Sequence, residues 1–277
     1  MDQPMKMASE VWRYEGGVLS KVTDTIVTEF PITIILNDQE FATLVCSPEH
    51  IEELIIGFLA SEGIIKSISE IKELTIVETT GRAIVKTHKV NKLNELFHSK
   101  RVVTSCCGKS RQSFYFYNDA RTVTPLGNVE VTVSMEECFN LMELMQQSSV
   151  IFQDTGGVHN AALCDKNGII VDRTDIGRHN ALDKIYGHCI QHSISLSNKI
   201  IVFSGRISSE VLLKVAKIGC GVVLSKSAPT ELALRLANEL NITTVGFIRN
   251  KSLNIYTKPE RINMHDVQVS ANTQSQL

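Results

Sequence analysis

The chain has 277 residues, of which 43% are hydrophobic and 21% charged, and its formal net charge is −2. This composition is typical of a folded globular protein with one or two domains. The slightly negative charge argues against a general affinity for nucleic acid or for an anionic membrane. We find no apolar run long enough for a membrane span and no signal-peptide core near the N-terminus. The odd number of cysteines, seven, then favours the reducing cytoplasm over a disulfide framework.

The N-terminal part predicts a mixture of strands and one helix. Residues 22–46 are rich in Ile, Val, Thr and Phe, with a turn at Asn37-Asp38. The pattern predicts strands at Asp24–Glu29, Ile32–Leu36 and Glu40–Cys46. A helix should follow, with Ser47 as N-cap, Pro48 as its first residue and Gly63 at its end. Two more strands are expected within residues 71–90. We expect an α+β domain over residues 1–122.

The C-terminal part predicts a different architecture. Ser134 and Glu137 have the spacing of a capping box, and Asn167-Gly168 is a hairpin turn between two short strands. After a helix from about Arg178 to His192, strands and helices alternate at Lys199–Ser204, Ser208–Ile218, Gly221–Ser225, Thr230–Leu240 and Thr243–Ile248. Such alternation is typical of a mainly parallel sheet with crossover helices. We therefore assign the chain to the α/β class, with a second domain at residues 123–265 and a disordered tail at 266–277.

Two adjacent cysteines, Cys106 and Cys107, stand in a polar loop of sequence Ser-Cys-Cys-Gly-Lys-Ser. Lys109 and Arg111 would favour the thiolate, which is the reactive form. A structural disulfide between neighbouring residues has poor geometry, whereas two thiols in contact suit sulfur exchange. The alternative is that both are small buried hydrophobic residues, a common fate of free cysteine. The polar context favours reactive thiols.

Basic and polar residues follow three successive strands of the expected parallel sheet. In open α/β sheets ligands bind beyond the carboxyl ends of the strands. The candidate ligand-binding residues there are Gly205, Arg206 and Ser208, then Lys226, and then Phe247, Ile248, Arg249, Asn250, Lys251 and Ser252. For any one segment ordinary turn chemistry is an adequate explanation, because none is a Walker A or GxGxxG motif. Three cations at equivalent positions nevertheless predict one crevice for a phosphorylated, nucleotide-like ligand.

Two histidines form a further candidate group. His159 follows paired glycines, and His179 follows Gly177 and Arg178 at an expected helix start. A single histidine is usually a hydrogen-bonded structural residue, but this repeated context makes His159, Arg178 and His179 candidate site residues. We expect no metal, because catalytic zinc needs three protein ligands and a zinc deaminase would show H-x-E with P-C-x-x-C.

These motifs together resemble those of the FdhD family, the formate dehydrogenase accessory sulfurtransferases. The resemblance runs from about residue 12 to Ile262 and is strongest in Asp-Ile-Gly-Arg-His-Asn-Ala-Leu-Asp-Lys at 175–184. It implies that sulfur passes from a cysteine desulfurase, as a cysteine persulfide, to the molybdenum cofactor (bis-molybdopterin guanine dinucleotide) before insertion into formate dehydrogenase. It also implies a cytidine-deaminase-like C-terminal part without the zinc site. The family's cofactor contact maps onto residues 247–252, so a guanine nucleotide such as GDP should mimic the cofactor.

The active loop departs from the family's common pattern in one respect. Many members have Cys-x-x-Cys with Gly after the second cysteine, whereas Thr104 stands here at the first position. Cys107 is followed by glycine, as the second cysteine of the family pattern is, and it is the expected persulfide carrier. Cys106 is a relay or substitute. An alternative function is a cofactor-binding chaperone that handles no sulfur, and a deaminase-type hydrolase is disfavoured by the missing zinc ligands. We further expect a cytoplasmic homodimer.

Overall fold

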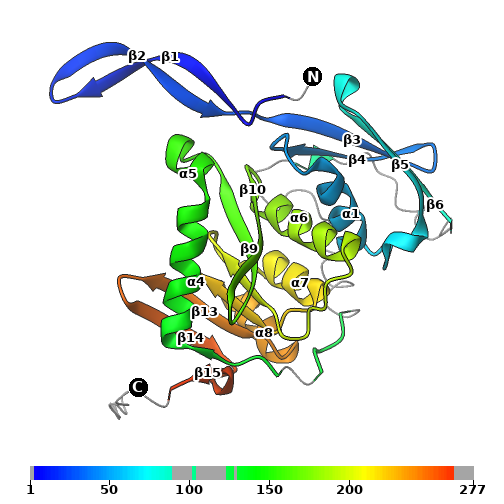
Figure 1. The fold of residues 1–277 in the computed structure, drawn as a ribbon, viewed down its shortest axis with the longest axis vertical. Helices are drawn as coiled ribbons and strands as arrows, with labels where there is room; N and C mark the ends of the chain where they lie inside the picture. Colours follow the sequence, from blue (N-terminus) through cyan, green and yellow to red (C-terminus); the bar gives the residue numbers. More distant parts are fainter. Residues whose placement is uncertain (1–2, 89–101, 104–122, 128–129, 265–277) are drawn as a thin grey trace.

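The structure is a computed structural model that describes residues 3–88, 102–103, 123–127 and 130–264. The expected reactive pair, Cys106 and Cys107, lies outside the described residues. So does the expected tail, and the boundary expected after residue 122 lies at the edge of the described segment 123–127. The described chain forms two layered parts, one built on each of two larger sheets, and a separate hairpin (Figure 1).

The first part is a five-stranded sheet with one helix packed against it. Its strand order is β5-β6-β3-β4-β7. The strands are β3 (Phe30–Leu36), β4 (Gln39–Cys46), β5 (Ile71–Val77), β6 (Arg82–Thr87) and β7 (Val102–Val103). Two single 3₁₀ turns, η1 (Ile68–Glu70) and η2 (Glu78–Thr80), precede and follow β5. Alternate residues of β3, such as Ile32 and Ile34, are buried against α1 (Ile51–Ser61), as the period-2 pattern requires.

The second part is a six-stranded sheet in the order β10-β9-β11-β12-β13-β14. Its strands are β9 (His159–Asp165), β10 (Gly168–Asp175), β11 (Ile200–Phe203), β12 (Val222–Ser225), β13 (Thr243–Arg249) and β14 (Ser252–Thr257). The strands β11, β12 and β13 are parallel, whereas β9, β10 and β14 join by antiparallel pairing. The predicted parallel sheet with crossover helices is confirmed for the three central strands, and the complete sheet is mixed.

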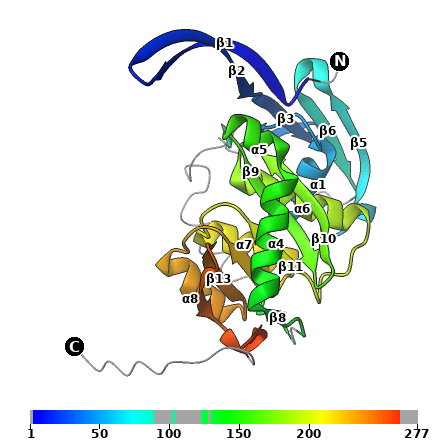
Figure 2. The same ribbon diagram turned by 60° about the vertical axis from the view of Figure 1, so that its left-hand side comes forward.

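Helices cover both faces of this second sheet (Figure 2). One face packs against α4 (Met135–Ser148), and the other packs against α6 (Arg178–Gln191), α7 (Ser209–Ile218) and α8 (Glu231–Glu239). Neighbouring residues of β9 therefore enter different cores: Leu163 faces α6, and Cys164 faces α4. The short helix α5 (Val150–Thr155) extends α4, and η3 (Pro259–Arg261) leads into β15 (Ile262–Asn263), which pairs with β8 (Val133–Ser134).

Several local predictions agree with the structure, and one is wrong. The capping box at Ser134 and Glu137 is formed, and the turn at Asn167-Gly168 joins β9 to β10. Ser47 is not the N-cap of α1, because the helix begins at Ile51 after His50 in the left-handed region (φ 56°). Ser47 is instead fully buried and bonded to β10 and α6. The fold also contains a strand that was not predicted, β1 (Lys6–Glu15), which pairs with β2 (Val18–Val27).

The two parts meet where α1 crosses α6 (Figure 1). Gly57 in α1 and Gly187 in α6 allow the backbones to approach closely. A Cβ atom on Gly57 would overlap the carbonyl oxygen of Asp183, and a Cβ atom on Gly187 would overlap that of Glu53. Because these obstacles are backbone atoms, no rotamer change can relieve the overlap. The paired glycines therefore fix the distance between the two parts.

We expect Gly187→Ala to lower the free energy of unfolding by about 3 kcal/mol or more, at the upper end of typical overpacking costs. The added methyl group would push α1 away from α6 and open both cores at the junction. Denaturant unfolding of purified protein measures the effect. Gly127→Ala is the control, since no atom lies within 4 Å of the position of its new Cβ. Equal stability of the two variants would contradict a tight crossing.

Candidate functional site

The turns after β11 and β12 are locked to each other by serine hydroxyls. Ser225 Oγ donates to the Gly205 carbonyl at 2.7 Å, and Ser227 Oγ donates to the Ser204 carbonyl at 3.1 Å. Ser208 caps α7 by accepting from the Val211 N–H. These bonds hold neighbouring strand ends at one edge of the sheet, as expected for parallel strands. Arg206 and Lys226 are exposed at this edge, one on each turn.

The third strand end forms one wall of a cavity of about 470 Å³. The turn between β13 and β14 supplies Ile248, Arg249, Asn250 and Lys251, and α4 supplies the opposite wall with Glu136, Phe139, Asn140, Met142, Glu143 and Gln146. Positive φ angles at Phe247, Asn250 and Lys251 shape this turn. The Arg249 guanidinium lies 5.3 Å from the centre of the Phe247 ring, a cation–π distance. The wall thus combines cations, carboxylates and one aromatic side chain.

The three basic side chains at the strand ends were expected to share one crevice, and the structure confirms this only in part. Arg249 lines the cavity, and Lys226 Nζ donates to Oε1 of the lining residue Gln146 at 2.7 Å. Arg206, Phe247 and Ser252 are not among the lining residues. Sequence reasoning also missed the α4 wall, although Glu136, Asn140 and Glu143 recur at helical spacing. The cavity therefore extends from the strand ends onto a helix.

The histidine group lies by the turn after β11. His159 begins β9, opposite Asp175 of β10, and an added Cβ on Gly205 would lie 3.5 Å from His159 Nδ1. His179, in the first turn of α6, has Nε2 3.3 Å from Oε2 of Glu210 in the first turn of α7. The structure therefore brings His159 and Gly205 together and directs His179 to a carboxylate.

Burial and neighbouring cations keep both imidazoles in the neutral form. Burial is the main reason why the pKa of His159 is lowered from its ordinary 6.5, and the charges of Arg178 and His179 lower it further. The pKa of His179 is also lowered, mainly by burial, although the Glu210 carboxylate 3.3 Å from its Nε2 opposes the shift. Arg178 Nε is buried without a hydrogen-bond partner among the residues that the structure describes. A neutral histidine near a cation can accept a proton while the cation binds an anion.

The run at 175–184 has a structural role that the sequence alone did not reveal. Asp175 and Lys184 form a fully buried ion pair at 2.8 Å. The Asp175 carboxylate also accepts from Ser47, from the Gly177 N–H and from Asn180 Nδ2. Since Ser47 directly follows β4, this network joins the first part to the start of α6. It thereby positions the residues next to Arg178 and His179.

A second polar cluster also joins the two parts. Glu53 of α1 accepts from Arg173 Nε at 2.5 Å and lies 2.8 Å from His188 Nδ1. Burial alone would raise the pKa of Glu53, but the hydrogen bonds from Arg173 and His188 outweigh it, so the pKa is lowered. The carboxylate therefore remains ionised and paired at neutral pH.

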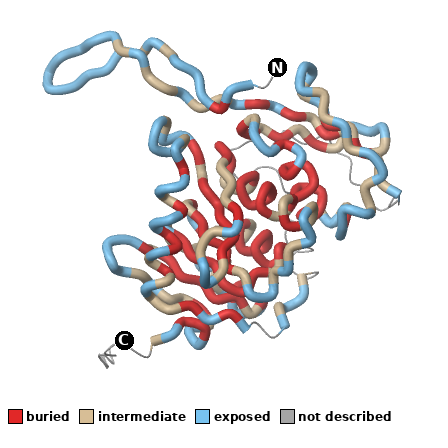
Figure 3. The backbone as a smooth tube through the Cα atoms, in the orientation of Figure 1, coloured by how far each residue is buried: buried red, intermediate tan, exposed pale blue. Residues whose placement is uncertain are grey.

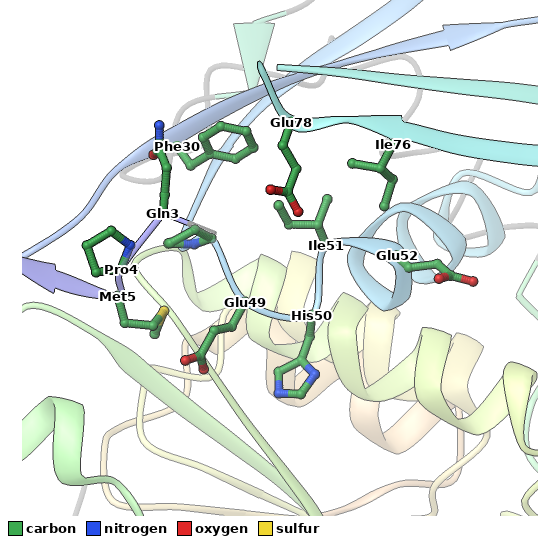
Figure 4. A pocket seen from close by; sticks show the side chains of 11 residues that line it. Gln3, Pro4, Met5, Phe30, Glu49, His50, Ile51, Glu52, Ile76 and Glu78 are labelled. Carbon is green, nitrogen blue, oxygen red and sulfur yellow. The ribbon is translucent and has the colours of Figure 1, made fainter. Parts of the chain in front are cut away.

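A separate cavity of about 520 Å³ lies where the N-terminal segment passes the start of α1 (Figure 4). Its lining includes Met5, Phe30, Ile51 and Ile76, and the Glu78 side chain reaches toward Ile51. None of the sequence-predicted site residues lines it. The candidate site is therefore the strand-end region with its α4 wall.

Five of the seven cysteines are buried thiols. They are Cys46, Cys138, Cys164, Cys189 and Cys220. Burial is the main reason why the pKa is raised to about 12 for the first four and is raised for Cys220 as well. A thiol with so high a pKa is scarcely ionised at neutral pH and is a poor nucleophile. The remaining two, Cys106 and Cys107, lie outside the described residues.

The chain is similar to known proteins over nearly its whole length. The model of the FdhD/NarQ family matches residues 27–263. Proteins named "Sulfur carrier protein FdhD" are 58% identical in Bacillus subtilis (strain 168), covering 95% of this chain and 99% of that one, and 53% identical in Listeria innocua, covering 91% and 97%.

A crystal structure from Desulfotalea psychrophila, of a protein described as a candidate formate dehydrogenase accessory protein, is similar with a TM-score of 0.78. It is 26% identical and covers 94% of this chain and 100% of that one. The chain belongs to the FdhD/NarQ family. Within the described residues, no helix is long and apolar enough to cross a membrane.

We expect the imidazoles of His159 and His179 to titrate below pH 6.5 in the folded protein, because burial and nearby cations disfavour protonation. NMR titration of the ring C–H signals measures both values. Arg178→Ala should raise the pKa of His159, since it removes a neighbouring positive charge. Arg235→Ala on α8 is the control and should leave the pKa unchanged. A value above 6.5 for His159 would contradict the described site.

Proposed function

We propose that this protein is a sulfur carrier that serves formate dehydrogenase. It takes sulfur from a cysteine desulfurase and passes it to the molybdenum cofactor, bis-molybdopterin guanine dinucleotide. Family membership supports the general role. The observation that carries the proposal is the burial of five thiols out of seven, which leaves the adjacent pair as the sulfur-handling group.

Cys107 is the proposed carrier. Its thiolate attacks the terminal sulfur of the donor's persulfide, a new S–S bond forms, the donor's S–S bond breaks, and the donor cysteine leaves as a thiolate. No net oxidation or reduction occurs in this step. Lys109 is the sequence neighbour that favours the Cys107 thiolate, and Cys106 is the relay or substitute.

Chain connectivity supports transfer between the thiols and the strand-end region. Val103 of β7 pairs with Leu44 of β4. The next residue of β4, Val45, accepts a hydrogen bond from Asn180 in the first turn of α6. Cys107 follows Val103 by four residues, which span at most roughly 14 Å when fully extended. Since β7 pairs with β4, and β4 is bonded to the start of α6, this length limits how far Cys107 can lie from the described end of β7.

The cavity beside α4 has the chemistry that a guanine nucleotide requires. Arg249 and Lys251 carry the positive charge that binds phosphate, and Lys226 stands beside Gln146 at the same wall. Glu136 and Glu143 supply carboxylates that can accept from the two N–H donors of the guanine edge, which adenine lacks. Phe139 offers an apolar face for the base. The residues present thus fit the cofactor, and GDP is the corresponding probe.

A cofactor-binding chaperone without sulfur transfer is the second candidate. The cavity supports it independently of the thiols, because the lining residues described, from α4 and the β13–β14 turn, could bind the cofactor whether or not sulfur is transferred. The two functions differ in one respect: a chaperone would work without Cys106 and Cys107.

We expect Cys107→Ala to lose the mass increment of one sulfur that wild-type protein gains on incubation with a cysteine desulfurase and cysteine. Intact-mass spectrometry detects this persulfide, and formate dehydrogenase produced with the variant should be folded but inactive. Cys106→Ala is the matched control and should keep the increment. The reverse pattern would make Cys106 the carrier, and a fully active double variant would favour the chaperone.

We expect GDP to bind more tightly than ADP in isothermal titration calorimetry. Arg249→Ala should weaken GDP binding by about 1.5–3 kcal/mol, the usual cost of losing a charge-assisted hydrogen bond. This corresponds to roughly ten- to hundred-fold in Kd. Arg206→Ala should have a smaller effect, because Arg206 does not line the cavity. Arg235→Ala is the control, and unchanged affinity in all three variants would place the nucleotide elsewhere.

A further inference from the structure

The cavity of about 520 Å³ at the start of α1 is not used by the proposed sulfur transfer. It lies where three segments meet: residues 3–5, residues 48–52 at the start of α1, and the end of β5 with Glu78 after it (Figure 4). Its volume falls within the roughly 300–1,000 Å³ that is usual for ligand pockets. The cavity is therefore large enough to receive a side chain of another molecule.

The inner wall of this cavity is apolar. Met5, Phe30 and Ile51 line it, and each is between 5% and 7% exposed. Ile76 of β5 extends the same wall. Figure 3 shows α1 as almost entirely buried chain, whereas the turn that follows β5 is exposed. An apolar wall beside exposed chain favours a ligand with an apolar part that leaves water on binding.

The rim of the cavity carries negative charge. Glu49, Glu52 and Glu78 are exposed lining residues, and the lining contains no lysine or arginine. His50 also lines the cavity, but burial and the charge of Arg173 lower its pKa, so the ring adds no positive charge at neutral pH. The dipole of α1 contributes only about half a positive charge at this end of the helix. Three carboxylates outweigh it, so the rim attracts cations.

Two of the three carboxylates are unpaired within the described chain. The side chains of Glu49 and Glu78 have no hydrogen bond or ion pair with any residue that the structure describes. Glu52 accepts a hydrogen bond from Gln191 Nε2 at 2.9 Å, and this neutral donor leaves its charge in place. By contrast, the neighbouring buried Glu53 is already paired with a guanidinium. The rim therefore keeps its negative charge for an incoming cation.

The exposure of the rim favours a side chain of a protein over a free small molecule. Small ligands usually bury 70–90% of their surface in a pocket, whereas all three carboxylates here belong to exposed residues. A docked protein supplies the missing enclosure, because the contacts around an anchor side chain exclude water. Arginine combines an aliphatic stem with a planar fork of donors that matches carboxylates, and it is enriched among such anchors.

We propose that this cavity is a docking site for a protein partner that presents an arginine beside an apolar residue. The apolar residue packs against Met5, Phe30 and Ile51, and the guanidinium lies at the rim with Glu49 and Glu78. This site and the cavity beside α4 share no lining residue. Docking here is therefore independent of nucleotide binding there, and it does not rest on the proposed sulfur transfer.

Titration of isotope-labelled protein with the dipeptide acetyl-Leu-Arg-amide tests the site by NMR. The backbone amide signals of Gln3, Ile51 and Glu78 should shift, because these residues line the cavity. Binding should weaken as salt is added, since the carboxylates are exposed and are screened. The double variant Glu49→Gln/Glu78→Gln should raise the Kd at least about ten-fold, because it removes both unpaired carboxylates.

Glu73→Gln is the matched control and should leave the Kd unchanged, because Glu73 of β5 does not line the cavity and is paired with Lys86. The dipeptide acetyl-Leu-citrulline-amide, which has a neutral group in place of the guanidinium, should bind at least about ten-fold more weakly. Amide spectra that are unaltered outside the cavity would show that the variants remain folded.

Three results would overturn the proposal: equal binding of the two dipeptides, shifts confined to residues outside the cavity, or an unchanged Kd in the double variant. Tighter binding of free arginine than of acetyl-Leu-Arg-amide would also overturn it, because the site would then serve a free metabolite instead of a protein segment.

Discussion

The buried ion pair between Asp175 and Lys184 is the interaction on which the relation of the two parts depends. Both side chains are fully shielded from solvent. Removing charged groups from water is costly unless their remaining hydrogen-bond donors and acceptors also find partners. Lys184 Nζ also donates to Ser47 Oγ at 2.8 Å and to the Thr174 carbonyl at 3.1 Å. The pair is therefore satisfied only when the end of β4, the end of β10 and the start of α6 are assembled together. This requirement couples the folding of one sheet to that of the other.

The glycine crossing imposes a second, steric constraint on the same junction. Gly57 and Gly187 let α1 and α6 approach until backbone atoms are in contact. At that distance Glu53 of α1 meets Arg173 and His188 across the interface. A wider spacing would leave these buried charges unpaired, so close packing and ionic pairing stabilise each other. We infer that the two parts move as one body in the folded protein.

Sequence patterns predicted local features better than the contacts between distant segments. The capping box at Ser134 and the turn at Asn37-Asp38, where both residues have positive φ, are fixed by chemistry within four residues. Ser47 was misassigned because its hydroxyl could cap a helix equally well, and its true partners lie 128 and 137 positions away. Strand β1 was missed because apolar residues occur on both of its faces, which hides the alternation that marks a half-buried strand. The α4 wall of the cavity required knowledge of which helix packs beside β13.

The junction also bears on the proposed sulfur transfer, because it joins the first sheet to the second. Sulfur exchange between thiolates needs direct contact of the reacting sulfur atoms, so the carrier must reach both its donor and its acceptor. A carrier attached to an independent domain would search a large volume for the acceptor. Here β7, which leads toward the cysteines, pairs with β4, and the end of β4 is bonded to α6 through Asn180. The described end of β7 is therefore linked through β4 to the first turn of α6. For the proposed sulfur transfer the buried ion pair would act through geometry, by holding the end of β4 against the start of α6.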